Sequence, residues 1–217
     1  MRLVHLTRPP DASLSTLPAP LLLLLHGVGS HEEDLFGLVS QLDLRFFVVS
    51  ARAPLTLGPH SYGWFHVTFT EHGPVIVPEE AEASRQTLIA FIDELIENYH
   101  LDPHRVYLMG FSQGAIMSLS LALTAPEKIA GVVAMSGRIL PEVLPLAVAP
   151  ERMNGLPIFV VHGLQDNVLP IHHGRASRDR LSQLPVALTY KEYDMGHQIS
   201  ADSLSDISNW LAEQLNR

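Results

Sequence analysis

The chain alternates short apolar segments with longer amphipathic ones, and this alternation constrains its fold more than any other feature. Gly, Pro, Asn and Asp punctuate the breaks. The short apolar runs cover residues 21–26, 46–51, 106–111, 129–135, 158–162 and 188–193. All but the last lack clear polar alternation, which is typical of strands buried on both faces of a parallel sheet.

The longer segments have the pattern of helices. Residues 79–99 carry apolar side chains at three- and four-residue steps, as an amphipathic helix does. Residues 113–124 are apolar or small throughout, and residues 200–215 place an apolar stripe behind a Ser/Asp cluster suited to capping. The sequence therefore predicts an α/β fold: a mostly parallel central sheet with helices on both faces, in one domain spanning 1–217.

Composition removes several classes of function. The chain has no Cys, which excludes disulfides, thiolate metal sites and a cysteine nucleophile. Its net charge of −9 argues against nucleic acid or an anionic membrane as partner. The 12 His residues show no HExxH spacing, so we expect neither a metal site nor a cofactor.

The first residues lack the basic and apolar regions of a signal peptide, and the longest purely apolar block is only residues 21–25. We therefore expect a cytoplasmic protein without stable membrane insertion.

The candidate nucleophile is Ser112, in the sequence Gly110-Phe111-Ser112-Gln113-Gly114. A predicted strand precedes this G-x-S-x-G pattern and a predicted helix follows it, which is the context that a nucleophile elbow requires. The turn strains the serine backbone, so strand and helix can pass only if Gly110 and Gly114 stay small. The alternative is an ordinary strand–helix turn, since Gly and Ser are common in turns.

A serine nucleophile needs a base, and the base needs an orienting carboxylate. Asp166 follows the strand at 158–162, and His197 follows the strand at 188–193. The order Ser112, Asp166, His197 is the one expected for an α/β-hydrolase. Alone, each of the last two could be a turn or capping residue. Weaker candidates nearby are Asp194, His172 and His173, and we expect His162 to support the loop.

Acyl transfer also needs donors for the oxyanion. The elbow aims the Gln113 N–H at the site, and the turn after the first central strand offers the Val28 N–H, with Gly27 permitting close approach. A plain β-to-α turn is the alternative for Val28.

Together these segments resemble the phospholipase/carboxylesterase family of α/β-hydrolases, in its bacterial carboxylesterase branch. The matching stretches are Leu25-His26-Gly27-Val28-Gly29, Gly63-Trp64-Phe65, the elbow with its Gln113, His162-Gly163 through Asp166 to Pro170, and Gly196-His197. The resemblance implies Ser112, Asp166 and His197 as triad and Val28 and Gln113 as oxyanion donors. It adds Trp64, Phe65 and Leu164 as substrate-binding residues.

Two departures favour the esterase branch. Thioesterase-like members often carry Asp where Ser30 and His66 stand here, which puts protein depalmitoylation in doubt. The segment between residues 135 and 158 is short, so we expect a small or absent cap. We therefore expect a serine carboxylesterase acting on small-molecule esters of short- to medium-chain acids, in a chain that could form a homodimer. The alternatives are a thioesterase or lysophospholipase and, in another class, a non-catalytic binding protein.

Overall fold

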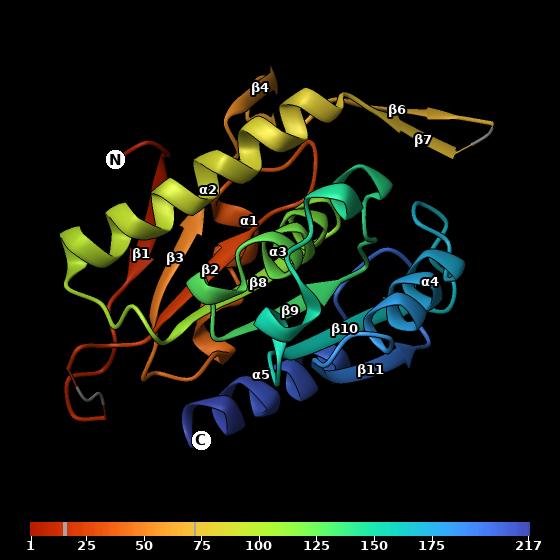
Figure 1. Ribbon diagram of the computed structural model, residues 1–217. Helices are drawn as coiled ribbons and strands as arrows, with labels where there is room; N and C mark the ends of the chain where they lie inside the picture. The colour runs from red at the N-terminus through yellow and green to blue at the C-terminus, as the bar shows by residue number, and fades with distance from the viewer. Residues whose placement is uncertain (15–16, 72) are drawn as a thin grey trace.

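A seven-stranded sheet runs through the middle of the computed structural model, which describes residues 1–14, 17–71 and 73–217, with Phe69 described by its backbone alone (Figure 1). The strand order is β1-β3-β2-β8-β9-β10-β11. All neighbouring pairs are parallel except β1 with β3. The strands of this sheet are β1 (His5–Arg8), β2 (Leu21–Leu25), β3 (Phe47–Ala51), β8 (Val106–Phe111), β9 (Gly131–Met135), β10 (Pro157–Gly163) and β11 (Ala187–Tyr193).

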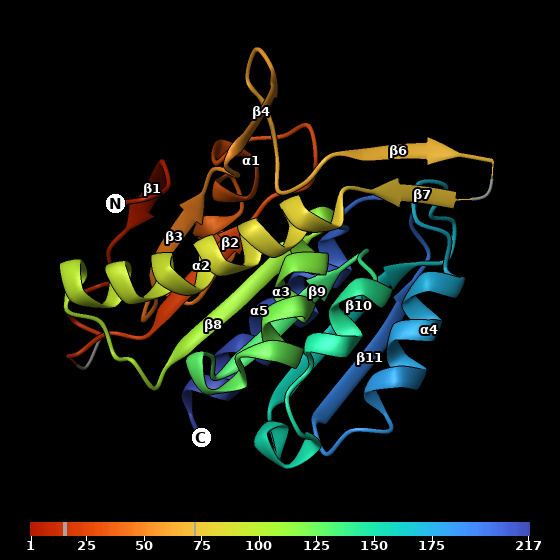
Figure 2. The same ribbon diagram turned by 45° about the horizontal axis from the view of Figure 1, so that its top comes forward.

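Helices cover both faces of the sheet. They are α1 (Glu33–Phe36), α2 (Pro78–Tyr99), α3 (Gln113–Thr124), α4 (His172–Leu181) and α5 (Ala201–Leu215). The core that contains residues of α2, α3 and α4 lies on one face, and the core with residues of α1 and α5 lies on the other (Figure 2). This arrangement confirms the predicted α/β fold.

Strand β2 shows why its sequence is an unbroken apolar run. Leu21, Leu23 and Leu25 belong to the first core, whereas Leu22 and Leu24 belong to the second. Successive side chains of a strand point to opposite faces, so a sheet covered on both faces needs apolar residues at every position. All five leucines are fully buried.

The ends of the long helices follow local sequence signals. Helix α2 begins at Pro78, at a position where the missing N–H costs nothing, and has Glu79 and Glu80 in its first turn. Helix α5 begins after Ser200, whose side chain accepts a hydrogen bond from the Ser203 N–H in a reciprocal capping box. The Ser/Asp cluster expected to cap this helix does so.

Several elements were not predicted. Strand β1 pairs antiparallel at the sheet edge, and two hairpins fill the stretch before α2. The hairpin strands are β4 (Leu55–Gly58) with β5 (Ser61–Gly63), and β6 (Val67–Thr70) with β7 (Gly73–Ile76). The second hairpin extends from the body of the molecule (Figures 1 and 2). Strands of three or four residues are too short to show a clear period of two.

The segment after β9 packs partly against the core. It contains two 3-10 turns, η3 (Pro141–Leu146) and η4 (Pro150–Met153); the other such turns are η1 (Val39–Gln41) and η2 (Pro126–Lys128). Leu140 and Val143 are buried and Leu144 packs against the core, whereas Leu146 is strongly exposed. Most of the leucine and valine side chains of residues 140–146 therefore pack against the core. Among the described helices, none is long and apolar enough to cross a bilayer.

Candidate active site

The carboxyl ends of five neighbouring parallel strands meet at one edge of the sheet. The Gly27–Val28 turn follows β2, Ser112 follows β8, and Arg138 lies beyond β9. Asp166 and His197 lie in the loops after β10 and β11. In sheets of this kind ligands bind at the carboxyl edge, so the topology alone brings these segments to one place.

Ser112 occupies a strained turn between β8 and α3. Its φ of 52° and ψ of −115° lie outside the regions that L-residues favour. A Cβ on Gly110 would overlap the backbone of Gly114, and a Cβ on Gly114 would overlap the carbonyl oxygen of Leu25. Both glycines are therefore required for β8, α3 and β2 to pass this closely, as the sequence pattern predicted.

Three side chains at this edge form one hydrogen-bonded chain. The Ser112 hydroxyl donates to Nε2 of His197 over 2.9 Å, and Nδ1 of His197 donates to Oδ2 of Asp166 over 2.7 Å. The Asp166 side chain is fully buried, while that of His197 is 16% exposed. The arrangement can move a proton from the hydroxyl to the imidazole and stabilise the resulting charge beside the carboxylate.

The loop that carries Asp166 is held from several sides. Oδ1 of Asp166 accepts hydrogen bonds from the N–H groups of Val168 and Leu169, at 2.9 and 2.8 Å. Buried His162 donates from Nε2 to the Leu169 carbonyl oxygen over 2.7 Å, and desolvation lowers its pKa. His162 thus supports the loop and does not contact Ser112, as we expected. The weaker candidates stay apart: Asp194 accepts a hydrogen bond from the Gln165 side chain, and His172 and His173 begin α4.

Buried His26 holds the turn that carries Val28. Its Nδ1 donates to the Gly27 carbonyl oxygen over 2.7 Å, and its Nε2 accepts from the Ala53 N–H over 3.0 Å. Both ring nitrogens are thereby satisfied in the neutral form, and desolvation lowers the pKa of His26. Within the described part of the chain, neither the Val28 nor the Gln113 N–H has a hydrogen-bond acceptor. Both remain free to donate to a ligand.

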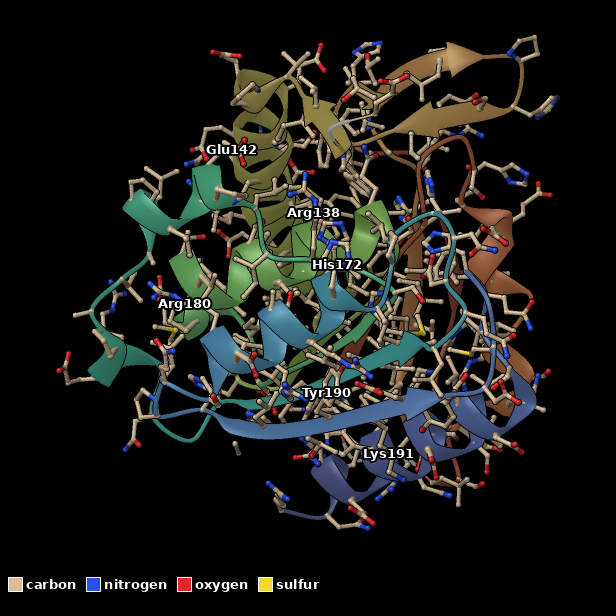
Figure 3. The ribbon with its side chains drawn as sticks, turned by 90° about the vertical axis from the view of Figure 1, so that its right-hand side faces the viewer. Arg138, Glu142, His172, Arg180, Tyr190 and Lys191 are labelled. Carbon is tan, nitrogen blue, oxygen red and sulfur yellow. The ribbon has the colours of Figure 1, made fainter. Side chains whose placement is uncertain are left out.

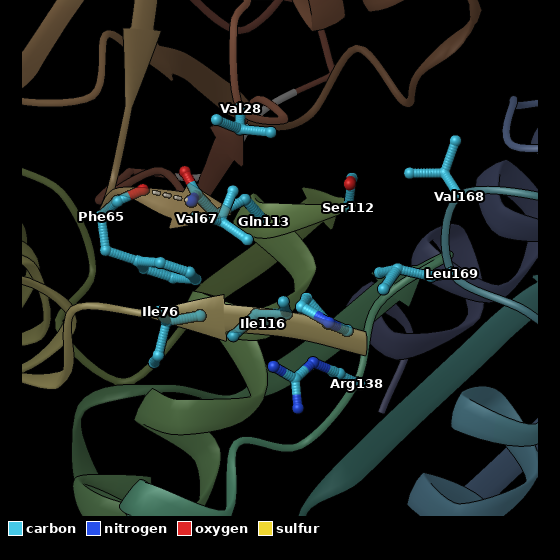
Figure 4. Close-up of a pocket in the computed structure, with 11 residues that line it drawn as sticks. Val28, Phe65, Val67, Ile76, Ser112, Gln113, Ile116, Arg138, Val168 and Leu169 are labelled. Atoms are coloured by element: carbon cyan, nitrogen blue, oxygen red, sulfur yellow. Dashed lines mark hydrogen bonds between the residues drawn. The ribbon is translucent and has the colours of Figure 1, made fainter. Parts of the chain in front are cut away.

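The Gln113 side chain binds the segment of Trp64 and Phe65. Its Oε1 accepts from the Trp64 N–H over 2.7 Å. Its Nε2 donates to the Phe65 carbonyl oxygen over 2.7 Å (Figure 4). Trp64 is fully buried and donates from its ring nitrogen to the His26 carbonyl oxygen over 3.0 Å. The structure therefore uses Trp64 as scaffold and brings only Phe65 to the cavity wall.

Two cavities adjoin Ser112. The smaller, of about 30 Å³, is bordered by Phe65, Ile116 and Arg138 (Figure 4). The larger, of about 440 Å³, contains His197 in its wall. Leu164, assigned to substrate binding from the sequence, is 46% exposed and borders neither cavity within the described residues.

Sequence reasoning missed most of the wall of the small cavity. Hairpin β6–β7 contributes Val67, Pro74 and Ile76, and helix α3 contributes Ile116. Ile116 lies one turn beyond Ser112, so helical spacing could have identified it. Arg138 follows the strand next to that of the nucleophile, so its position in the sequence could also have identified it. The hairpin gave no comparable signal, because its place depends on tertiary packing.

No group of three or more His, Asp or Glu residues in the described ranges could hold a metal ion.

The whole chain is similar to known ester hydrolases. A model of the Phospholipase/Carboxylesterase family matches residues 13–215. Acyl-protein thioesterase 1 of Neurospora crassa is 28% identical over 210 residues, which cover 89% of this chain and 86% of the relative. The crystal structure of esterase PE8 superposes with a TM-score of 0.80 at 28% identity, covering 98% of this chain and 99% of that one. The carboxylesterase of Bacillus cereus shares the fold, with a TM-score of 0.80 at 22% identity and coverage of 98% and 94%.

Proposed function

Because the chain belongs to the phospholipase/carboxylesterase family of α/β-hydrolases, we propose that it is a serine carboxylesterase that cleaves short- to medium-chain acyl esters through an acyl-serine intermediate. The observation that carries the proposal is the hydrogen-bonded chain from Ser112 through His197 to Asp166, beside a small apolar cavity.

In the first half of the reaction the Ser112 oxygen attacks the ester carbonyl while Nε2 of His197 takes the hydroxyl proton. Negative charge moves to the carbonyl oxygen, where the free N–H groups of Val28 and Gln113 can bind it. The carbon–oxygen bond to the alcohol then breaks, and Nε2 returns its proton to the departing oxygen. Water repeats these steps on the acyl-serine and releases the acid.

The positions of the two cavities separate the acyl and alcohol sides. The departing oxygen must lie within reach of His197, because His197 protonates it. The larger cavity borders His197 and therefore suits the alcohol, which leaves the small cavity for the acyl group. At about 30 Å³ the small cavity is narrow, which favours a short acyl chain.

Labelling with a fluorophosphonate probe tests the nucleophile. We expect covalent labelling of the wild type and none of Ser112→Ala, with turnover of a p-nitrophenyl ester lowered by about 10³-fold or more. Ser136→Ala is the matched control, because Ser136 is also buried, also has positive φ, and follows the neighbouring strand. If Ser112→Ala kept its labelling and turnover, the proposal would be wrong.

A thioesterase is the second candidate, favoured by the similarity to acyl-protein thioesterase 1 of Neurospora crassa. To distinguish the two, kcat/KM is measured for the oxygen ester and the thioester of the same acid, in a series of acids of increasing chain length. We expect the oxygen ester to be preferred and activity to fall as the acyl chain grows. A preference for long-chain thioesters would favour the second candidate.

A further inference from the structure

Arg138 borders the small cavity beside Ser112, and nothing in the reaction described above uses it. It stands two residues beyond Ser136, past the carboxyl end of β9. In Figure 4, Ser112 lies toward the top of the pocket and the Arg138 guanidinium toward the bottom. Among the described residues that line the pocket, Arg138 alone is charged, and most of the others are apolar.

The guanidinium of Arg138 has no acidic partner within the described ranges. Its Nε is buried without a hydrogen-bond acceptor, and its side chain makes no ion pair with any described residue. Glu142, on the same segment (Figure 3), attracts it only at a distance. By contrast, Arg45, Arg52 and Arg85 each bind a carboxylate through two nitrogens.

Burial makes an unpaired guanidinium at Arg138 unfavourable. Desolvation lowers the pKa of Arg138, yet a guanidinium stays protonated in proteins, so the site holds a partly desolvated positive charge. His173 does not add a second charge nearby, because burial lowers its pKa to about 4. A cavity wall with one unpaired guanidinium is complementary to a small anion.

The placement of the alcohol and acyl groups determines which part of the substrate would carry that anion. The alcohol leaves on the His197 side, whereas Arg138 borders the cavity assigned to the acyl group. We propose that Arg138 binds a carboxylate at the far end of the acyl group, so that the preferred substrates are half-esters of short dicarboxylic acids. This inference rests on the proposed esterase function and specifies the acyl part of its substrate.

A carboxylate suits the site better than a larger anion. Its two oxygens match the fork of a guanidinium, and it adds few atoms to a cavity of about 30 Å³. Arg138 also borders a separate cavity of about 310 Å³ together with Arg180, on α4 (Figure 3). Arg180 therefore serves as the matched control, because an anion bound in that second cavity would depend on both arginines.

The test compares monomethyl succinate with methyl butyrate, and monomethyl glutarate with methyl pentanoate, in a pH-stat. We expect the wild type to have the higher kcat/KM for the anionic ester of each pair. Arg138→Gln should lower the ratio of anionic to neutral kcat/KM by about 10- to 100-fold, the range for losing a charged hydrogen bond. Arg138→Lys should keep part of the ratio, and Arg180→Gln should leave it unchanged.

Equal or higher wild-type activity on the neutral esters, with a ratio that Arg138→Gln does not change, would overturn the proposal. An equal loss in Arg180→Gln would place the anion in the other cavity and overturn it as well. If Arg138→Gln does not fold, the wild type is tested by competition. The proposal then predicts that free succinate slows fluorophosphonate labelling of the wild type and that butyrate does not. Failure of the esterase function itself looks different: no ester of either kind is cleaved, and Ser112 is not labelled.

Discussion

At the scale of single residues, the site depends on glycines, because the missing Cβ atom allows close contacts between backbone segments. Gly110 and Gly114 leave room for backbone to pass backbone around Ser112. Gly163 does the same farther along the edge, where a Cβ would overlap the carbonyl oxygens of Met195 and Gly196. The last contact brings the Asp166 loop against the His197 loop, and the Gln165 N–H donates to the Met195 carbonyl oxygen over 3.0 Å. Small residues thus bring the reactive side chains within hydrogen-bonding distance.

One prediction concerns Gly114. Gly114→Ala forces its new methyl group onto the Leu25 carbonyl oxygen, so the backbone of β2 or α3 must shift. We expect a loss of roughly 2–3 kcal/mol in the free energy of unfolding, the usual cost of overpacking. Urea denaturation measures it. Gly58→Ala is the control, because its Cβ would make an ordinary contact at 3.8 Å and should change stability by less than about 0.5 kcal/mol.

At the scale of elements, hairpin β6–β7 shapes the acyl cavity although it belongs to no layer of the main sheet. Val67 and Ile76 pair across its base, and both border the cavity. Neighbouring Val75 is 59% exposed and does not border it. The hairpin therefore presents one face to the cavity and the other to solvent, as alternation along a strand requires.

A second prediction follows for acyl-length preference. Ile76→Ala removes part of the cavity wall and should move the optimum of kcat/KM toward longer acyl chains. Val75→Ala, the adjacent control, should leave the optimum in place. Turnover across a series of p-nitrophenyl esters of increasing acyl length measures both. An identical profile for Ile76→Ala and the wild type would show that the hairpin does not limit the acyl group.

At the scale of the whole molecule, three buried or half-buried histidines are held neutral by the fold. Desolvation is the main cause that lowers the pKa of His26, His162 and His173, the last to about 4. In the unfolded chain each titrates near its ordinary pKa of about 6.5. As pH falls below that value the unfolded chain takes up protons that the folded chain does not.

Stability should therefore fall with pH in this window. Between the folded and unfolded pKa values, each such histidine destabilises the fold by at most about 1.4 kcal/mol per pH unit. We expect Tm to be highest above pH 7 and to decrease from pH 6.5 toward pH 4. Thermal unfolding of the wild type and His173→Gln at matched pH values measures the effect. A substituted protein with the same pH dependence as the wild type would exclude His173 as a contributor.

Much of this protein could be predicted from sequence because the signals are local. The apolar runs of β2 and β8, the amphipathic pattern of α2 and the cap at Ser200 each depend on a few neighbouring residues. The elbow is also local, since the two glycines around Ser112 are needed wherever strand, turn and helix pack this tightly. Asp166 and His197 could be placed because parallel strands deliver their following loops to one edge.

Only the tertiary structure decided which side chains surround that edge. Trp64 and Leu164 had the right type and position in the chain, yet Trp64 is buried as scaffold and Leu164 is exposed and borders neither cavity within the described residues. Ile76 had no distinguishing neighbours in sequence, and its place at the cavity follows from packing between segments far apart along the chain. A local pattern specifies the conformation of its own segment, whereas the wall of a cavity is assembled from several segments at once.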